Sequence, residues 1–217
     1  GDGDKAIIVR QTDVAGNQST NSASLDFSLI TLPDLAVPDG SHVFRLDGGK
    51  TSDRSGTSVS SAGDVNGDGY DDLLVGAKDA DPQGNSSGAS YVVFGKADGF
   101  SSTVALSSLN GVTGFRLDGV AASDQSGISV SSAGDVNGDG YDDLLVGAPG
   151  ADPNGSNSGS SYVVFGKADG FSSTVALSSL DGVTGFRLDG VAGDDRSGYS
   201  VSSAGDVNGD GYDDLLV

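Results

Sequence analysis

Several residue types are absent or rare in this 217-residue chain, and each absence limits its chemistry. There is no cysteine, so neither a disulfide nor a cysteine-ligated zinc site is available. Glutamate is absent as well, and the single histidine, His42, is interpreted as a surface or linker residue rather than a general base. No serine is paired with a visible base, so a Ser-His-Asp triad is not supported. The sequence therefore predicts a protein that is not an enzyme.

Long apolar runs and basic clusters are also missing. No run of 18 apolar residues occurs, so no membrane span is expected within the chain. Lys and Arg number 11 against 31 Asp and Glu, which gives a formal net charge of −20. Such an acidic surface argues against nucleic acid as a partner and fits the binding of divalent cations. No secretion signal is visible, and because the chain starts at Gly1 and stops within a repeat, we expect it to be a piece of a longer protein.

The chain does contain an internal repeat. The pentapeptide FRLDG begins at Phe44, Phe115 and Phe186, a constant step of 71 residues. After it come a strand of small residues, an acidic turn, the apolar strand DDLLVGA, a Gly/Asn/Ser-rich loop, the strand SYVVFG and a longer connection. Four antiparallel strands repeated in tandem predict an all-β fold of β-propeller blades in an incomplete propeller. A β-solenoid or an open sandwich is the alternative.

The acidic turn is the decapeptide GDVNGDGYDD, which begins at Gly63, Gly134 and Gly205. Oxygen-bearing groups recur at alternate positions of this turn, and Gly69 supplies the positive φ that a sharp bend requires. In the first copy these groups belong to Asp64, Asn66, Asp68, Tyr70 (its backbone carbonyl) and Asp72. Calcium takes six to eight such oxygens in flexible geometry, whereas softer metals prefer His or Cys. A solvated Asp-Gly turn is the alternative, and three copies in register argue against it.

Two other calcium loops do not fit the turn. Loop positions are numbered from the first aspartate, so that Asp64, Asp135 and Asp206 are position 1. An EF-hand or dockerin loop needs an acidic residue at position 12 followed by a helix, but position 12 here is Val75, Val146 or Val217. The nine-residue RTX repeat has a different period. The sequence therefore predicts a calcium loop within a β-hairpin. Asp71, Asp142 and Asp213, at position 8, are expected to face solvent.

The segment SVSSAGDVNGDGYDDLLVGAP, at residues 129–149, resembles the FG-GAP repeat of integrin α-subunit propellers and their bacterial relatives. The resemblance covers residues 42–217 and implies about one calcium ion per repeat, bound in the loop between the first two strands of a blade. It departs from the family only at Lys78, which replaces the usual Pro outside the metal loop. The ligands it implies are Asp64, Asn66, Asp68, Tyr70 and Asp72, then Asp135, Asn137, Asp139, Tyr141 and Asp143, then Asp206, Asn208, Asp210, Tyr212 and Asp214.

The repeats also divide the chain. We expect a first blade at 42–114, a second at 115–185 and part of a third at 186–217. Residues 33–41, with two prolines, read as a linker. Residues 1–32 read as two strands around a VAGN turn, and they resemble the end of a bacterial immunoglobulin-like domain.

Together these features predict a calcium-binding adhesion or interaction module of a large secreted or cell-surface protein. The partner is expected to be a protein or glycan on another cell or matrix, and further blades are needed to close the propeller. The alternative is a non-catalytic propeller accessory to an extracellular enzyme such as a phospholipase.

The binding face is expected opposite the acidic turns. Differences between the first two copies gather in the loops at 49–56 and 78–89 and their counterparts at 120–127 and 149–160, whereas the connection at 97–113 barely differs from its counterpart. In integrin-like propellers the face opposite the calcium loops is the one that meets the ligand.

Overall fold

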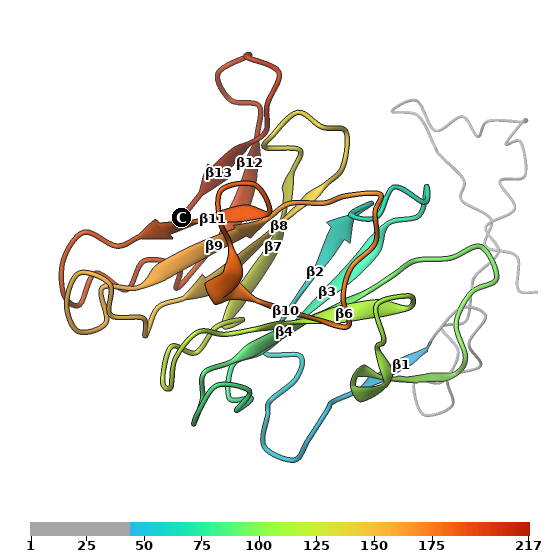
Figure 1. Cartoon of the computed structure of the whole chain (residues 1–217), viewed down its shortest axis with the longest axis horizontal. Coiled ribbons are helices and arrows are strands. Elements are labelled where there is room, and N and C mark those ends of the chain that lie inside the picture. The colour runs from blue at the N-terminus through green and yellow to red at the C-terminus, as the bar shows by residue number, and fades with distance from the viewer. Residues whose placement is uncertain (1–43) are drawn as a thin grey trace, which may run out of the picture.

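The computed structural model describes residues 44–217 (Figure 1). The predictions of an immunoglobulin-like fragment at 1–32 and a linker at 33–41, and the interpretation of His42, concern residues outside the described part. Within residues 44–217 the helical elements are two short 3₁₀ turns, η1 (Leu106–Ser108) and η2 (Leu177–Ser179). No helix of this part is long and apolar enough to cross a membrane.

The first blade is a four-stranded antiparallel sheet within residues 58–118. Its strands, in spatial order, are β2 (Ser58–Gly63), β3 (Asp72–Ala77), β4 (Ala89–Val93) and β6 (Gly114–Asp118). Val75 lies opposite Val59 on one side and Tyr91 on the other. Valine, leucine and aromatic side chains fit a pleated and buried surface, which is why these short runs form strands.

The second blade repeats this order. Its strands are β7 (Ser129–Gly134), β8 (Asp143–Ala148), β9 (Ser160–Val164) and β11 (Gly185–Asp189). A third blade begins with β12 (Ser202–Gly205) and β13 (Asp214–Leu216), which pair antiparallel. The first strands of the three copies, β2, β7 and β12, lie side by side. The predicted all-β fold of four-stranded antiparallel blades in an incomplete propeller is confirmed.

Two short strands in the long connections join one blade to another. In the second copy, β10 (Thr174–Ala176) leaves its own blade and pairs parallel with β6, the outer strand of the first blade. In the first copy, β5 (Thr103–Ala105) pairs in the same way with β1 (Arg45–Asp47). The sequence predicts only a connection at 97–113. The structure shows that this connection and its counterpart each contribute a short paired strand.

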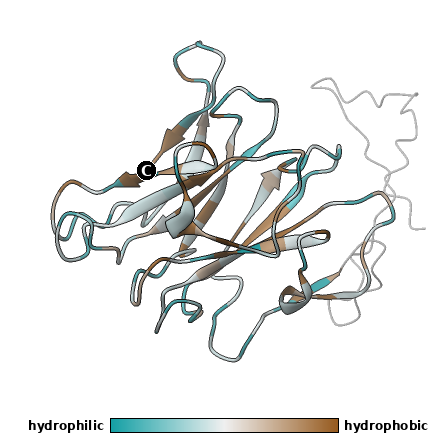
Figure 2. Ribbon diagram, viewed as in Figure 1, coloured by the Kyte–Doolittle hydropathy of each residue, from teal (hydrophilic) through white to brown (hydrophobic). Residues whose placement is uncertain are grey.

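The hydrophobic core lies between the blades. Along β3, side chains alternate: Leu74 joins the cluster shared with the second blade, while Leu73 and Val75 face the opposite side. Both faces of the central strands are therefore buried, and Figure 2 shows apolar residues along the strands and hydrophilic residues in the loops. The ring of Phe171, from the connection before β10, stacks on Phe115 of the first blade with centroids 4.2 Å apart.

Candidate metal-binding loops

The acidic decapeptides form three loops, each joining the first and second strands of a blade. We call residues 63–72 the first loop, 134–143 the second and 205–214 the third. They project side by side along one edge of the molecule (Figure 1). The hairpin register shifts beside each loop, between Ser61 and Gly63 in the first. At the tip Gly69 has φ of 89°, a left-handed conformation that side-chain-bearing residues rarely adopt.

Asp64 lies at the centre of the first loop. Its carboxylate accepts hydrogen bonds from the backbone N–H groups of Gly67 and Gly69, each at 2.8 Å, and of Asp68 at 3.0 Å. The Asn66 and Asp68 side chains also turn into the loop, since Asn66 Nδ2 donates to Asp68 Oδ2 at 3.0 Å. Hydrogen bonds within the loop therefore orient three oxygen-bearing side chains without a bound cation.

The second loop repeats this pattern at Asp135, Asn137 and Asp139, with the same donors at 2.7–3.1 Å. In the third loop, Asp206 accepts the three equivalent N–H bonds, and the backbone donors, led by Gly211, lower the pKa of its carboxyl group. There the Asn208 amide donates to Asp214 rather than to Asp210.

Asp72 ends the first loop and is fully buried. One carboxylate oxygen accepts from the N–H of Val65 at 3.1 Å, and the other accepts from Gly95 at 2.8 Å. Burial, with the charges of Asp68 and Asp64 adding to it, raises the pKa of Asp72 to about 7 despite these two donors. In the second loop Asp143 is equally buried, and burial raises its pKa to about 7 as well.

These residues fit a calcium ion by their chemistry. Every side-chain atom proposed to bind the ion is an oxygen. The buried carboxyl group of Asp72 lies near the carboxylates of Asp68 and Asp64, which disfavour its ionisation. A dication among them would reverse that effect. Across residues 44–217, no three His, Cys, Asp or Glu side chains are already gathered closely enough to hold a metal ion. The loop oxygens are engaged by the loop's own amides instead, so metal binding requires some rearrangement.

The aspartates at position 8 are placed differently from the prediction that they face solvent. Asp142 and Asp213 are half-buried, and each bonds to a neighbouring loop: Asp142 to the backbone N–H of Asp64 at 2.8 Å, and Asp213 to that of Asp135 at 2.9 Å. The exposed Asp71 agrees with the prediction. The sequence carries no separate signal of this role, because all ten positions of the decapeptide are identical in the three copies.

The loops at the other ends of the strands pack against one another between copies. The N–H groups of Ser123 and Gln125 donate to the carbonyls of Asn85 and Ser86, at 2.8 and 3.0 Å. Arg54 pairs with Asp79 at 3.0 Å. A hollow there is lined by Ser52, Arg54, Lys78, Asp79, Asn85 and Gln125, among others.

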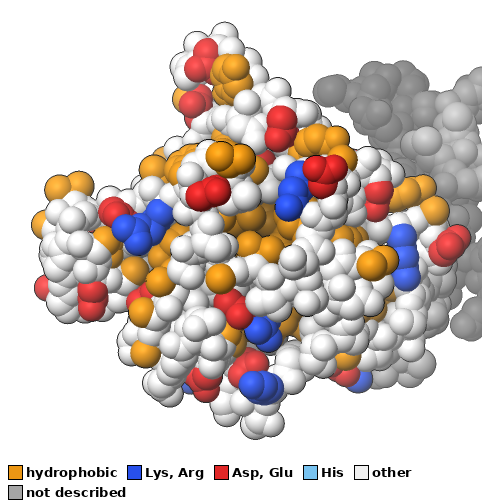
Figure 3. All heavy atoms as spheres, viewed as in Figure 1, with side chains coloured by type: hydrophobic (Ala, Val, Ile, Leu, Met, Phe, Trp, Pro, Cys, Tyr) orange, Lys and Arg blue, Asp and Glu red, His pale blue; other side chains and the backbone are white. Residues whose placement is uncertain are grey.

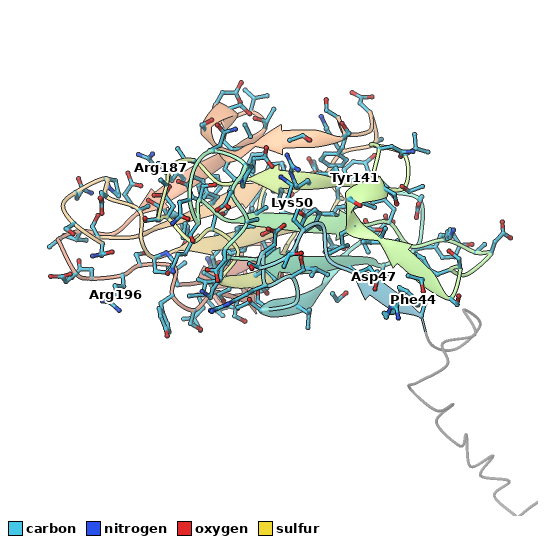
Figure 4. All side chains as sticks on the ribbon, turned by 90° about the horizontal axis from the view of Figure 1, so that it is seen from below. Phe44, Asp47, Lys50, Tyr141, Arg187 and Arg196 are labelled. Atoms are coloured by element: carbon cyan, nitrogen blue, oxygen red, sulfur yellow. The ribbon has the colours of Figure 1, made fainter. Side chains whose placement is uncertain are left out.

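These loops lie apart from the acidic loops. Figure 4 places Arg196, in a later copy of the 49–56 link, at one end of the view and Tyr141, in the second acidic loop, toward the other. Arg54, Gln125 and Arg196 occupy equivalent positions and share a positive φ of 54–55°. Such strain persists only where surrounding contacts impose it.

Comparison with known proteins gives a consistent result. Residues 55–93, 126–164 and 197–217 match the FG-GAP repeat, and these stretches include the three acidic loops. Similar proteins include integrin alpha-6 of Gallus gallus, 31% identical over 155 residues, or 71% of this chain and 12% of the relative. Integrin alpha-PS2 of Drosophila melanogaster is 30% identical over 81% of this chain and 12% of its own. Integrin alpha-3 of Cricetulus griseus is 33% identical over 79% of this chain and 15% of its own. The chain thus spans less than a sixth of the length of these relatives.

Proposed function

The chain carries FG-GAP repeats and is similar to integrin alpha chains, and from that premise we propose that it is a calcium-binding, non-catalytic adhesion or interaction module of a larger secreted or cell-surface protein. The observation that supports calcium most directly is Asp72, a buried carboxyl group near two further carboxylates. We include in the proposal the bacterial origin and the immunoglobulin-like strands at 1–32, which the described residues do not address.

Calcium would be held by the five candidate residues of each loop. In the first loop these are the side chains of Asp64, Asn66, Asp68 and Asp72, with the Tyr70 carbonyl. When bound, the ion supplies positive charge among carboxylates that otherwise repel one another. The chain's own contribution is a preformed hairpin: Asp64 gathers the loop amides, and Asp72 ties the loop to the strands through Val65 and Gly95.

The test is thermal unfolding with calcium and with excess EGTA. Extracellular calcium modules bind with Kd of about 0.1–1 mM. At a calcium concentration about ten times Kd, each site adds roughly 1.4 kcal/mol to the free energy of unfolding. Three sites are expected to raise Tm by several degrees. Magnesium at the same concentration is the control, and identical Tm values with calcium and EGTA contradict the proposal.

We place the partner on the face opposite the acidic loops. Two observations support this: the loops that differ between copies line the hollow at Arg54, Lys78 and Asp79, whereas the connection at 97–113, which pairs with β1, is nearly unchanged. The same face also exposes charged groups of both signs, which suit a polar partner.

The double charge reversal Lys50→Glu/Arg54→Glu tests this face. Both side chains are exposed and Arg54 makes only a surface ion pair, so the fold should tolerate the change. Adhesion to immobilised matrix proteins and to a glycan array should fall, while the calcium-dependent rise in Tm stays. Substitutions at exposed Asp98 and Val112 in the 97–113 connection, outside the hollow that Lys50 lines, serve as the control. Loss of adhesion from these alone would overturn the placement.

A further inference from the structure

Adjacent acidic loops are bonded directly to one another. Asp142 of the second loop makes two contacts with Asp64 of the first: its carboxylate accepts from Asp64 N at 2.8 Å, and its own N–H donates to Asp64 O at 3.3 Å. The third loop repeats both contacts with the second, where Asp213 meets Asp135 at 2.9 and 3.1 Å. Because the pattern occurs twice between identical loops, it belongs to the way that the blades stack.

Glycines in the earlier loop make room for the later one. A Cβ atom on Gly67 would overlap the ring of Tyr141, and one on Gly63 would overlap the carboxylate of Asp142. The second loop repeats this, with Gly138 against Tyr212 and Gly134 against Asp213. In the third loop a Cβ atom on Gly205 or Gly209 would meet nothing within 4 Å among the described residues.

These contacts involve Asp64, the residue whose carboxylate organises the first candidate metal site. The side chain of Asp64 gathers three amides of the first loop, while the backbone of the same residue is held from outside by Asp142. A hydrogen bond to an ionised carboxylate is stronger than a neutral one. Fixing Asp64 in place before the ion arrives lowers the entropy cost of binding it.

We propose that Asp142 and Asp213 are positioning residues that couple neighbouring calcium loops, so that the calcium affinity of each loop depends on the loop of the following blade. This inference rests on the proposed function. Asp142 supports the first loop and Asp213 supports the second. Asp71 is the matched control, because it has the same chemistry and the same position but an exposed side chain with no earlier loop beside it in residues 44–217.

The experiment follows each loop separately in the full chain. With ¹⁵N-glycine labelling, the amide resonances of Gly69, Gly140 and Gly211 report on the first, second and third loops during a calcium titration. Asp142→Ala should raise the Kd read at Gly69 by at least about tenfold, as expected for loss of a hydrogen bond to a charged group, and leave Gly211 unchanged. Asp213→Ala should do the same at Gly140.

The control variants separate the loss of the hydrogen bond to Asp64 from the loss of a negative charge. Asp71→Ala removes one negative charge from the first loop itself, and it should change the Kd at Gly69 by less than about twofold. Asp142→Asn keeps an acceptor oxygen and should recover most of the affinity. Equal effects of Asp71→Ala and Asp142→Ala, or no effect of either, would overturn the coupling.

A second measurement keeps the coupling testable if calcium does not bind. If no glycine resonance responds to calcium in the folded wild-type chain, the proposed function fails. Amide hydrogen exchange measured without metal then tests, independently of calcium, whether Asp142 holds the backbone of Asp64. Asp142→Ala should lose about tenfold protection at the Asp64 N–H, while Asp71→Ala retains it. Unchanged protection at Asp64 in Asp142→Ala would overturn the coupling whatever calcium does.

Discussion

Gly67 and Gly209 show how one residue acquires different roles in identical loops. Both are at position 4 and have nearly equal left-handed φ angles, 73° and 77°. Only Gly67 is covered, by the ring of Tyr141 from the next blade. The local sequence cannot distinguish the two glycines, whereas the stacking of blades does.

This difference leads to a matched pair of substitutions. Gly67→Ala and Gly209→Ala should each cost about 1 kcal/mol because of the positive φ. Gly67→Ala should cost a further 1–3 kcal/mol or so, because its methyl group overlaps Tyr141. Urea unfolding of the two variants measures the difference. The double variant Gly67→Ala/Tyr141→Ala should recover part of the extra loss, and equal costs for the two single variants would show that the ring does not hold this position.

At the scale of elements, the connection that carries β10 joins two blades. It places Phe171 on Phe115 and within 6.1 Å of Phe94, while Lys167 Nζ lies 5.1 Å from the Phe171 ring. Its first-copy counterpart carries Phe100, which stacks on Phe44 and has Lys96 Nζ 5.3 Å from its ring, so within residues 44–217 the two copies differ in aromatic contacts and not in the lysine. Aromatic pairs contribute about 0.5–1.5 kcal/mol beyond the area that they bury.

Phe171→Ala should therefore destabilise the chain more than Phe100→Ala does. We expect a loss of about 2–3 kcal/mol for Phe171, less than for a fully buried phenylalanine because its ring is only half-buried. About half that loss is expected for Phe100, which has one aromatic partner among residues 44–217. Chemical denaturation with fluorescence of the six tyrosines follows both variants. A larger loss of stability for Phe100→Ala than for Phe171→Ala would show that the connection carrying β10 stabilises the chain less than the connection carrying β5.

For the whole molecule, the described blades form an open arc with apolar residues at both ends. Val59 on β2 is 68% exposed, whereas its equivalents Val130 and Val201 are each 7% exposed because an earlier blade covers them. At the other end Val207 is 72% exposed, whereas Val65 in the first loop is fully buried. Figure 3 shows apolar and acidic side chains together on the protruding third loop.

The 217-residue chain alone should therefore self-associate or aggregate. Propellers contain about four to eight blades, and unpaired strand edges invite pairing with another chain. Sedimentation velocity should show species larger than a monomer. Val59→Asp/Val207→Asp should shift the distribution toward monomer with little change in Tm, because both positions are exposed. A compact monomer of the unmodified chain would contradict this expectation.

Much of the fold and the candidate ligand set is predictable from the sequence because both are local and repeated. Short apolar strands and an oxygen at every second loop position depend on neighbours a few residues away, and the constant step of 71 residues shows that each copy repeats them. Strand order within a blade follows from these patterns, and the structure confirms it. The ligand assignment itself stays a prediction that the calcium titration will test.

Contacts between blades were decided only by the tertiary structure. The sequence predicts that Asp142 faces solvent, yet it reaches Asp64 across 78 residues of chain, and β10 leaves its own blade to pair with β6. Identical decapeptides end in different surroundings because the first loop is covered by the second, while nothing in residues 44–217 covers the third. The physical reason is that short apolar runs specify which segments become buried strands, while the stacking of blades determines which residues meet across their faces.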